Sequence, residues 1–135
     1  MAVLRFKAAT KNNVLTQVKN AIDAGDGPGI MRIYSGAMPA SPDATETGTL
    51  LAELTLSDPC GTVAGGELVF DEITQDVEAN ADGVAGYART YDSYLNSVFD
   101  GDVSNTGGTG FLKLNTTVIV AGGPVKISSC VLRVG

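Results

Sequence analysis

The segment TLLAELTLSDP, residues 49–59, decides the fold class of this chain. Every second position from 50 to 56 is leucine or alanine, and Glu53 and Thr55 lie between them. A period of two residues is typical of a β-strand with one buried face, because successive side chains point to opposite faces of a sheet. Pro59 ends the pattern, since proline has no backbone N–H to donate to a strand ladder. The segment therefore predicts a strand that stops before Pro59.

Strand patterns also occur on both sides of that segment. Ile30–Tyr34 lies upstream, and Val84–Tyr91 lies downstream with its larger side chains on one face. Short apolar runs bounded by Gly, Pro, Asn or Asp predict further strands at 68–70, 77–79, 95–103, 111–114, 117–120 and 125–134. Gly61, Gly65 and Gly66 predict a flexible connection. Six to nine short strands at a spacing of about 8–12 residues are typical of an all-β sandwich or barrel.

Only residues 11–22 show a convincing helical pattern. Thr10 is the predicted N-cap, and Gly25 in the sequence GDGPG is the predicted stop. Between them the apolar residues recur mainly at four-residue spacing and form one stripe on a helix: Val14, Leu15, Val18, Ala21 and Ile22. We therefore expect one short N-terminal helix in an otherwise β protein.

Length and composition favour a single domain. The chain has 135 residues, 44% of them apolar and 18% charged, and it contains 17 glycines. A charged fraction below the usual ~25% together with many glycines is typical of a turn-rich β protein. We expect one domain, with an arm and helix in 1–25 and a β body in 26–135. No stretch approaches the ~18 consecutive apolar residues of a membrane span, and the first residues lack the apolar block of a secretory signal.

Charge is distributed unevenly along the chain, whose formal net charge is −6. The first acid is Asp23, and four cations precede it: Arg5, Lys7, Lys11 and Lys19. All 15 acids and the other five cations follow. Such a body repels phosphate backbones, so nucleic acid is not an expected partner, and neither is a membrane. The basic N-terminal segment is either a solvated helix face or a contact for an acidic protein surface.

Side chains that carry enzyme chemistry are scarce. Histidine is absent, which removes the commonest general base and the commonest metal ligand. The two cysteines, Cys60 and Cys130, read as reduced, partly buried thiols, with one long-range disulfide as the alternative. Carboxylate pairs that a glycosidase would need occur only in turn-like, polar surroundings: Asp71–Glu72, Asp76–Glu78 and Asp100–Asp102. The sequence predicts a binding protein without catalytic residues, cofactor or metal.

Two segments are candidate protein interfaces. In the first seven residues Leu4 and Phe6 alternate with Arg5 and Lys7, which predicts an extended arm that adds to the sheet edge of a partner. An edge strand of the chain's own sheet is the alternative. The second candidate is the face of the 84–91 strand that carries Tyr87, Arg89 and Tyr91, since Tyr and Arg are enriched at binding hot spots. Its alternative is a partly exposed sheet face with cation–π stacking.

Several motifs resemble a known family. They are GPGIMRIYSG at 27–36, PASPDA at 39–44, TGTLLAELTLSDP at 47–59, Tyr91-Asp92 with FDGDV at 99–103, and LNTT at 114–117 with AGG at 121–123. Together they resemble short tailed-bacteriophage proteins encoded among the head genes. The resemblance covers the chain after Gly25, and residues 1–24 fit in character. The motifs are turns and strand ends, so they specify the fold better than they specify the role of the protein.

The resemblance implies a capsid cement (decoration) protein with a jelly-roll-like β-sandwich. Its implied partner is the major capsid protein, and its implied location is the capsid surface of the virion after synthesis in the host cytoplasm. Self-association as a dimer or trimer is also expected, through exposed edge strands such as Val125–Val134. The alternatives are a tail or baseplate component, a module that binds glycans or a host surface through its tyrosines, and a hydrolase with an acid pair.

Overall fold

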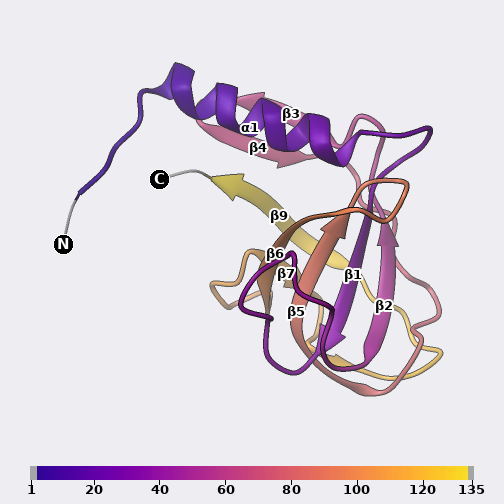
Figure 1. Cartoon of the computed structure of the whole chain (residues 1–135). Helices are drawn as coiled ribbons and strands as arrows, with labels where there is room; N and C mark the ends of the chain where they lie inside the picture. Colours follow the sequence, from indigo (N-terminus) through magenta and orange to yellow (C-terminus); the bar gives the residue numbers. More distant parts are fainter. Residues whose placement is uncertain (1–2, 134–135) are drawn as a thin grey trace.

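The structure is a computed structural model that describes residues 3–133 (Figure 1). Its elements along the chain are α1 (Ala8–Ile22), β1 (Ile30–Ser35), β2 (Leu50–Thr55), β3 (Gly61–Ala64), β4 (Glu67–Phe70), β5 (Gly83–Tyr91), β6 (Ser97–Asn105), β7 (Leu112–Leu114), β8 (Val118–Ile119) and β9 (Ile127–Arg133). The predicted β class with one short helix is confirmed.

The strands form one curled sheet in the order β2-β1-β5-β6-β7-β9-β4-β3, with β8 paired to the start of β5. All pairs are antiparallel except β6–β7. We call β2, β1, β5 and β6 the loop-covered half, because the loop 36–49 is bonded to it. We call β7, β9, β4 and β3 the helix-covered half, because α1 lies along β3 and β4 (Figure 1).

A single hydrophobic core joins the two halves, so the chain is one domain. Leu15 and Ile22 of α1 are fully buried in it, beside Leu68 of β4 and Leu112 of β7. The loop-covered half contributes fully buried side chains to the same core: Met31, Ile33, Leu51, Ala52 and Leu54. Each fully buried leucine stabilises the fold by roughly 1.5–3 kcal/mol relative to exposure. The helix is therefore part of the core and not an appendage.

The helix begins earlier than the sequence predicted. It starts at Ala8 with Lys7 as N-cap, and no side chain caps it, so Thr10 lies inside the first turn and the predicted N-cap is wrong. The buried stripe also differs, because Leu15 is buried whereas Val14 is 40% exposed. The helix ends at Ile22 with Asp23 as its C-cap, so it stops shortly before the predicted Gly25.

One strand was missed because its glycines were interpreted as a flexible connection. Gly65 and Gly66 have φ angles of 59° and 77°, so they close a tight two-residue turn between β3 and β4. At Gly61 a Cβ would collide with the carbonyl oxygen of Val69 on the paired strand. These glycines allow close pairing and a tight turn, and they make this segment a hairpin.

The predicted strand at 77–79 is wrong. Residues 74–80, which include this segment, instead cover the open edge of β2, and the Asn80 N–H donates to the Leu51 carbonyl over 2.8 Å. The Asp76 carboxylate accepts the backbone N–H of Glu53 over 2.9 Å. Side-chain and irregular backbone bonds therefore protect an edge that would otherwise invite strand addition.

The last strand is not an edge. β9 lies between β7 and β4 and pairs with both, so the expectation that the last strand is an exposed edge is wrong. The sequence pattern of β9 indicated a strand, but its neighbours come from residues 112–114 and 67–69, which local pattern does not reveal. In the described part of the chain no helix has the length and hydropathy to cross a membrane.

Candidate functional site

The N-terminal arm, residues 3–7, has no strand partner and runs away from the body (Figure 1). Leu4 is 71% exposed and Phe6 is 38% exposed, while Arg5 and Lys7 are also on the surface. Neither cation forms an ion pair within residues 3–133. The interpretation as an edge strand of the chain's own sheet is therefore wrong for residues 3–7, which form an arm without a strand partner; residues 1 and 2 lie outside the described residues.

The arm precedes α1, and α1 is fixed to the body near both of its ends. Near its start, the Asn12 side-chain oxygen accepts the Gly66 N–H of the β3–β4 turn over 2.8 Å. At its end, Asp23 accepts the backbone N–H of Cys60 over 2.9 Å and pairs with Lys19 over 3.1 Å. The arm is therefore a short free segment on a rigid base.

The second predicted interface is not on the surface. Tyr87 is fully buried, and Arg89 and Tyr91 are each 2% exposed. The loop 36–49 covers this face of β5 and is bonded to it at several points. The expectation that these three side chains form a partner interface is therefore wrong for this fold, because their polar groups are already used within the chain.

Arg89 holds the loop and the sheet together. Its Nε and Nη2 donate to the two carboxylate oxygens of Asp100 on β6 over 2.6 and 3.0 Å, and its Nη1 donates to the carbonyl of Ala44 over 2.7 Å. The side chains of this pair are 2% and 3% exposed. The Asp100 hydrogen bond raises the pKa of Arg89, so the guanidinium stays charged. Two-pronged pairing of this kind fixes orientation as well as charge.

The tyrosines secure the rest of the loop. The Tyr87 hydroxyl donates to the Thr47 carbonyl over 2.8 Å and accepts the Thr47 N–H over 3.0 Å. The Tyr91 hydroxyl donates to Glu46 over 2.8 Å and shares a 2.8 Å hydrogen bond with the Tyr34 hydroxyl. Burial, followed by these bonds, raises the pKa of Tyr91. We call Tyr34, Tyr87, Arg89, Tyr91 and Asp100 the loop clamp.

The expected cation–π contact exists with a different cation. The Arg32 guanidinium lies 5.4 Å from the centre of the Tyr91 ring and pairs with Glu53 over 2.8 Å. Tyr34 and Tyr87 stack with ring centres 5.3 Å apart. Of the four tyrosines only Tyr94, 62% exposed, presents its ring to solvent, so the face expected to hold a glycan is not available.

Three of the six candidate catalytic carboxylates, those of Asp76, Asp100 and Asp102, have structural partners. Asp100 is bound by Arg89, and Asp102 accepts the backbone N–H of Phe111 over 2.8 Å. Asp76 accepts backbone N–H groups from both Glu53 and Glu78. Among residues 3–133 no group of three or more His, Cys, Asp or Glu side chains could hold a metal ion. These acids position backbone segments.

Both cysteines are free and buried. Burial is the main cause that raises the pKa of Cys60 and of Cys130 to about 12, and the Asp23 carboxylate adds to the effect at Cys60. A thiol with such a pKa is almost entirely protonated near neutral pH and is a poor nucleophile. The two cysteines act as small core residues.

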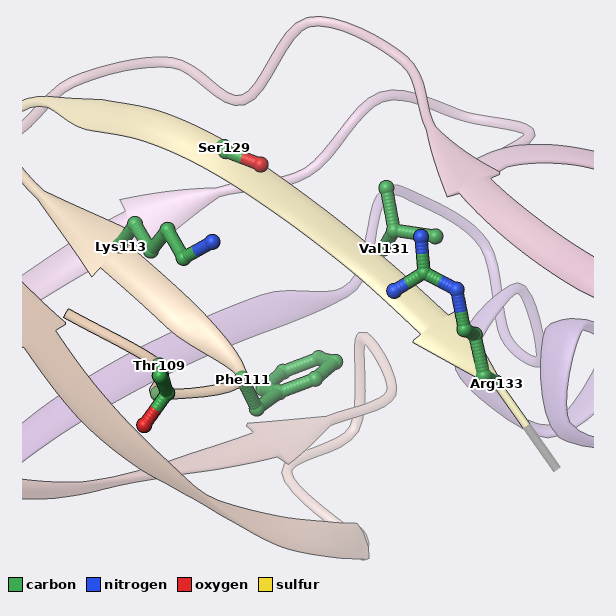
Figure 2. A pocket seen from close by; sticks show the side chains of 7 residues that line it. Thr109, Phe111, Lys113, Ser129, Val131 and Arg133 are labelled. Carbon is green, nitrogen blue, oxygen red and sulfur yellow. The ribbon is translucent and has the colours of Figure 1, made fainter. Parts of the chain in front are cut away.

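A pocket of about 220 Å³ lies across β7, β9 and the loop before β7 (Figure 2). Lys113 and Arg133 stand on opposite sides of it, with Ser129 and Val131 of β9 between them and the Phe111 ring facing them (Figure 2). The sequence pattern predicts no site here, because the lining residues belong to segments that only the β7–β9 pairing brings together.

Comparisons with protein-family models, with curated proteins and with solved structures found no match. Two surface features of the described residues are the main candidates for binding. These are the exposed arm on its fixed helix and the basic pocket between β7 and β9.

Proposed function

We propose that this protein is a decoration protein of a tailed-bacteriophage head, which binds the major capsid protein and stabilises the shell by protein–protein contacts. The observation that carries the proposal is the arm. Its apolar and basic side chains are exposed, unpaired and mounted on a fixed helix. An isolated monomer gains nothing from such an arm, whereas a partner surface would cover Leu4 and Phe6.

The proposed contact between the arm and the capsid protein is an addition of a strand to a sheet edge. An extended segment adds to an open sheet edge through backbone hydrogen bonds, and alternate side chains then face the partner. Complete burial of an exposed side chain of this size contributes roughly 1.5–3 kcal/mol. Leu4, 71% exposed, can gain most of this, whereas Phe6, 38% exposed, gains a smaller share. Arg5 and Lys7 would meet carboxylates on the capsid surface. Repetition over many copies turns such a modest contact into a large stabilisation of the shell.

The fold is compatible with this role. We propose that the curled sheet is a jelly-roll-like sandwich, in which the loop-covered and helix-covered halves are the two four-stranded layers. One core joins both halves, and the loop clamp makes the body rigid. A rigid body with one free arm loses little conformational entropy on binding beyond the ordering of the arm.

Self-association on the capsid is part of the proposal and has a different basis from the one expected. β9 offers no free edge, but Val84 and Val118 are cross-strand partners, each 60% exposed. Val120, two residues further along the same face, is 62% exposed. This strip of three valines is an exposed apolar surface at which neighbouring copies can meet.

The direct test is co-sedimentation of the purified protein with empty heads built from the capsid protein of the same phage. Band intensities give the ratio of bound protein to capsid subunit. Near-equal amounts support the decoration role. A tail or baseplate component would be found in a few copies per complete virion and would leave empty heads undecorated. Absence of binding to heads would overturn the proposal.

A further inference from the structure

The acids of this chain are confined to its middle. Residues 103–135 contain no Asp or Glu, and neither do residues 1–22, so all 15 acids lie between Asp23 and Asp102. Seven of the nine cations lie in the two acid-free terminal segments. The two cations of the middle segment, Arg32 and Arg89, are paired with Glu53 and Asp100. The cations available to a partner are therefore in the terminal segments.

The fold brings these two segments to the same half of the molecule. α1 packs on β4, β4 pairs with β9, and β9 pairs with β7. Arg133, at the end of β9, forms an ion pair with Glu67 at the start of β4. The residue before Glu67 is the turn glycine Gly66, whose N–H donates to the Asn12 side chain of α1. The end of β9 and the base of the arm therefore lie on one side of the body (Figure 1).

The pocket on this side has unused binding groups. Lys113, half-buried in the pocket wall, forms no ion pair within residues 3–133. Arg133 uses Nε for Glu67, which leaves its terminal amino groups to face the pocket (Figure 2). Thr109 and Ser129 also line it, and Phe111 and Val131 supply apolar wall. Donors over an apolar surface suit a carboxylate on a short hydrocarbon stem.

We propose that the pocket binds an aspartate or glutamate side chain on an extended acidic segment of the capsid protein that the arm also contacts. This inference rests on the proposed function and adds a second anchoring point to it. At about 220 Å³ the pocket is smaller than the about 300–1,000 Å³ of sites for drug-sized ligands, so a single side chain is the appropriate occupant. A nucleic-acid occupant is disfavoured, because the net charge of −6 repels phosphate backbones.

The test compares two charge reversals of equal size in the co-sedimentation assay. Lys113→Glu changes the pocket, and Lys126→Glu changes an exposed cation of the same acid-free segment that does not line the pocket. We expect Lys113→Glu to weaken head binding about tenfold or more and Lys126→Glu less than about threefold, since only the first removes a partly desolvated partner of the carboxylate. Thermal unfolding of both variants shows whether the fold is retained.

Carbodiimide cross-linking of wild-type protein on heads identifies the occupant. We expect an amide bond between Lys113 and a capsid Asp or Glu, located by mass spectrometry of the digested complex. Equal losses for the two variants, no loss for either, or a Lys113 link to a second copy of this chain would each overturn the pocket proposal. Wild-type binding to heads would still uphold the decoration role in those cases, whereas no wild-type binding would overturn both.

Discussion

Two regions of this protein carry similar side chains but differ in their exposure to solvent. The arm presents Phe6 beside Arg5, and β5 presents Tyr87 and Tyr91 beside Arg89. The arm side chains are exposed, whereas those of β5 are at most 2% exposed. The difference comes from a covering segment, because the loop 36–49 bonds to β5 and no described residue pairs with the arm. Residue type alone does not distinguish a clamp from an interface.

The comparison also separates two roles of charge. In the clamp the charge of Arg89 is neutralised by a buried partner, so it contributes to the conformation of the chain itself. In the arm the charges are free, so they are available to a second molecule. The following variants test whether the clamp and the arm differ in this way.

The largest expected effect is on the clamp. Arg89→Met removes the guanidinium and leaves the Asp100 carboxylate buried without its partner, which costs about 3–5 kcal/mol in the free energy of unfolding. Arg32→Met, which breaks a more exposed pair, should cost less than about 1 kcal/mol beyond its lost contact with Tyr91. Urea unfolding measures both. Equal losses would show that the clamp is no more structural than a surface ion pair.

The next effect concerns the base of the arm. Leu15→Ala removes a fully buried side chain between α1 and the sheet and should cost about 2–5 kcal/mol. Val14→Ala, its neighbour on the exposed side, should cost less than about 0.5 kcal/mol. Urea unfolding gives both values. A loss below 1 kcal/mol for Leu15→Ala would mean that the helix is not anchored in the core and that the arm lacks a fixed base.

The smallest effect is the acid sensitivity of the loops around the clamp. Burial works to raise the pKa of Asp92, but hydrogen bonds from Asn96 and the Tyr94 backbone bring it below its usual value. The backbone of Glu46 and the Tyr91 hydroxyl lower the pKa of Glu46. With the folded pKa below the unfolded one, these groups contribute full stability above about pH 4.5 and lose it as the pH falls through the folded pKa.

Urea midpoints between pH 7 and pH 3 measure this dependence. Asp92→Asn should unfold more easily at pH 7 by roughly 1 kcal/mol, because neutral acceptors bond more weakly, and its stability should fall less on acidification. A steeper fall for Asp92→Asn than for wild type would contradict a folded pKa of Asp92 below its unfolded value.

Much of the strand pattern is predictable from the sequence. The alternation in 49–56 and the apolar runs at 30–34 and 84–91 indicate β2, β1 and β5, because each strand's side chains are sorted by its own period. The four-residue spacing around Val18 likewise indicates α1. These are local properties, and the structure confirms them.

What could not be predicted depends on contacts between distant segments. The covering of Tyr87 by Thr47 joins residues 40 positions apart, and the loop sequence carries no periodic signal. The pocket between Lys113 and Arg133 likewise exists only through the pairing of β7 with β9. The arm was predictable because its exposure requires no such contact. Sequence therefore indicated the exposed arm better than the buried cluster.

We propose that the arm binds the capsid, whereas the loop clamp stabilises the fold. The most direct measurement is head co-sedimentation of the double variant Leu4→Ser/Phe6→Ser, with its urea midpoint determined in parallel. We expect a nearly unchanged midpoint, because the arm has no strand partner and Leu4 is 71% exposed, and a loss of head affinity of about tenfold or more. Full occupancy of heads by a folded double variant would contradict the claim.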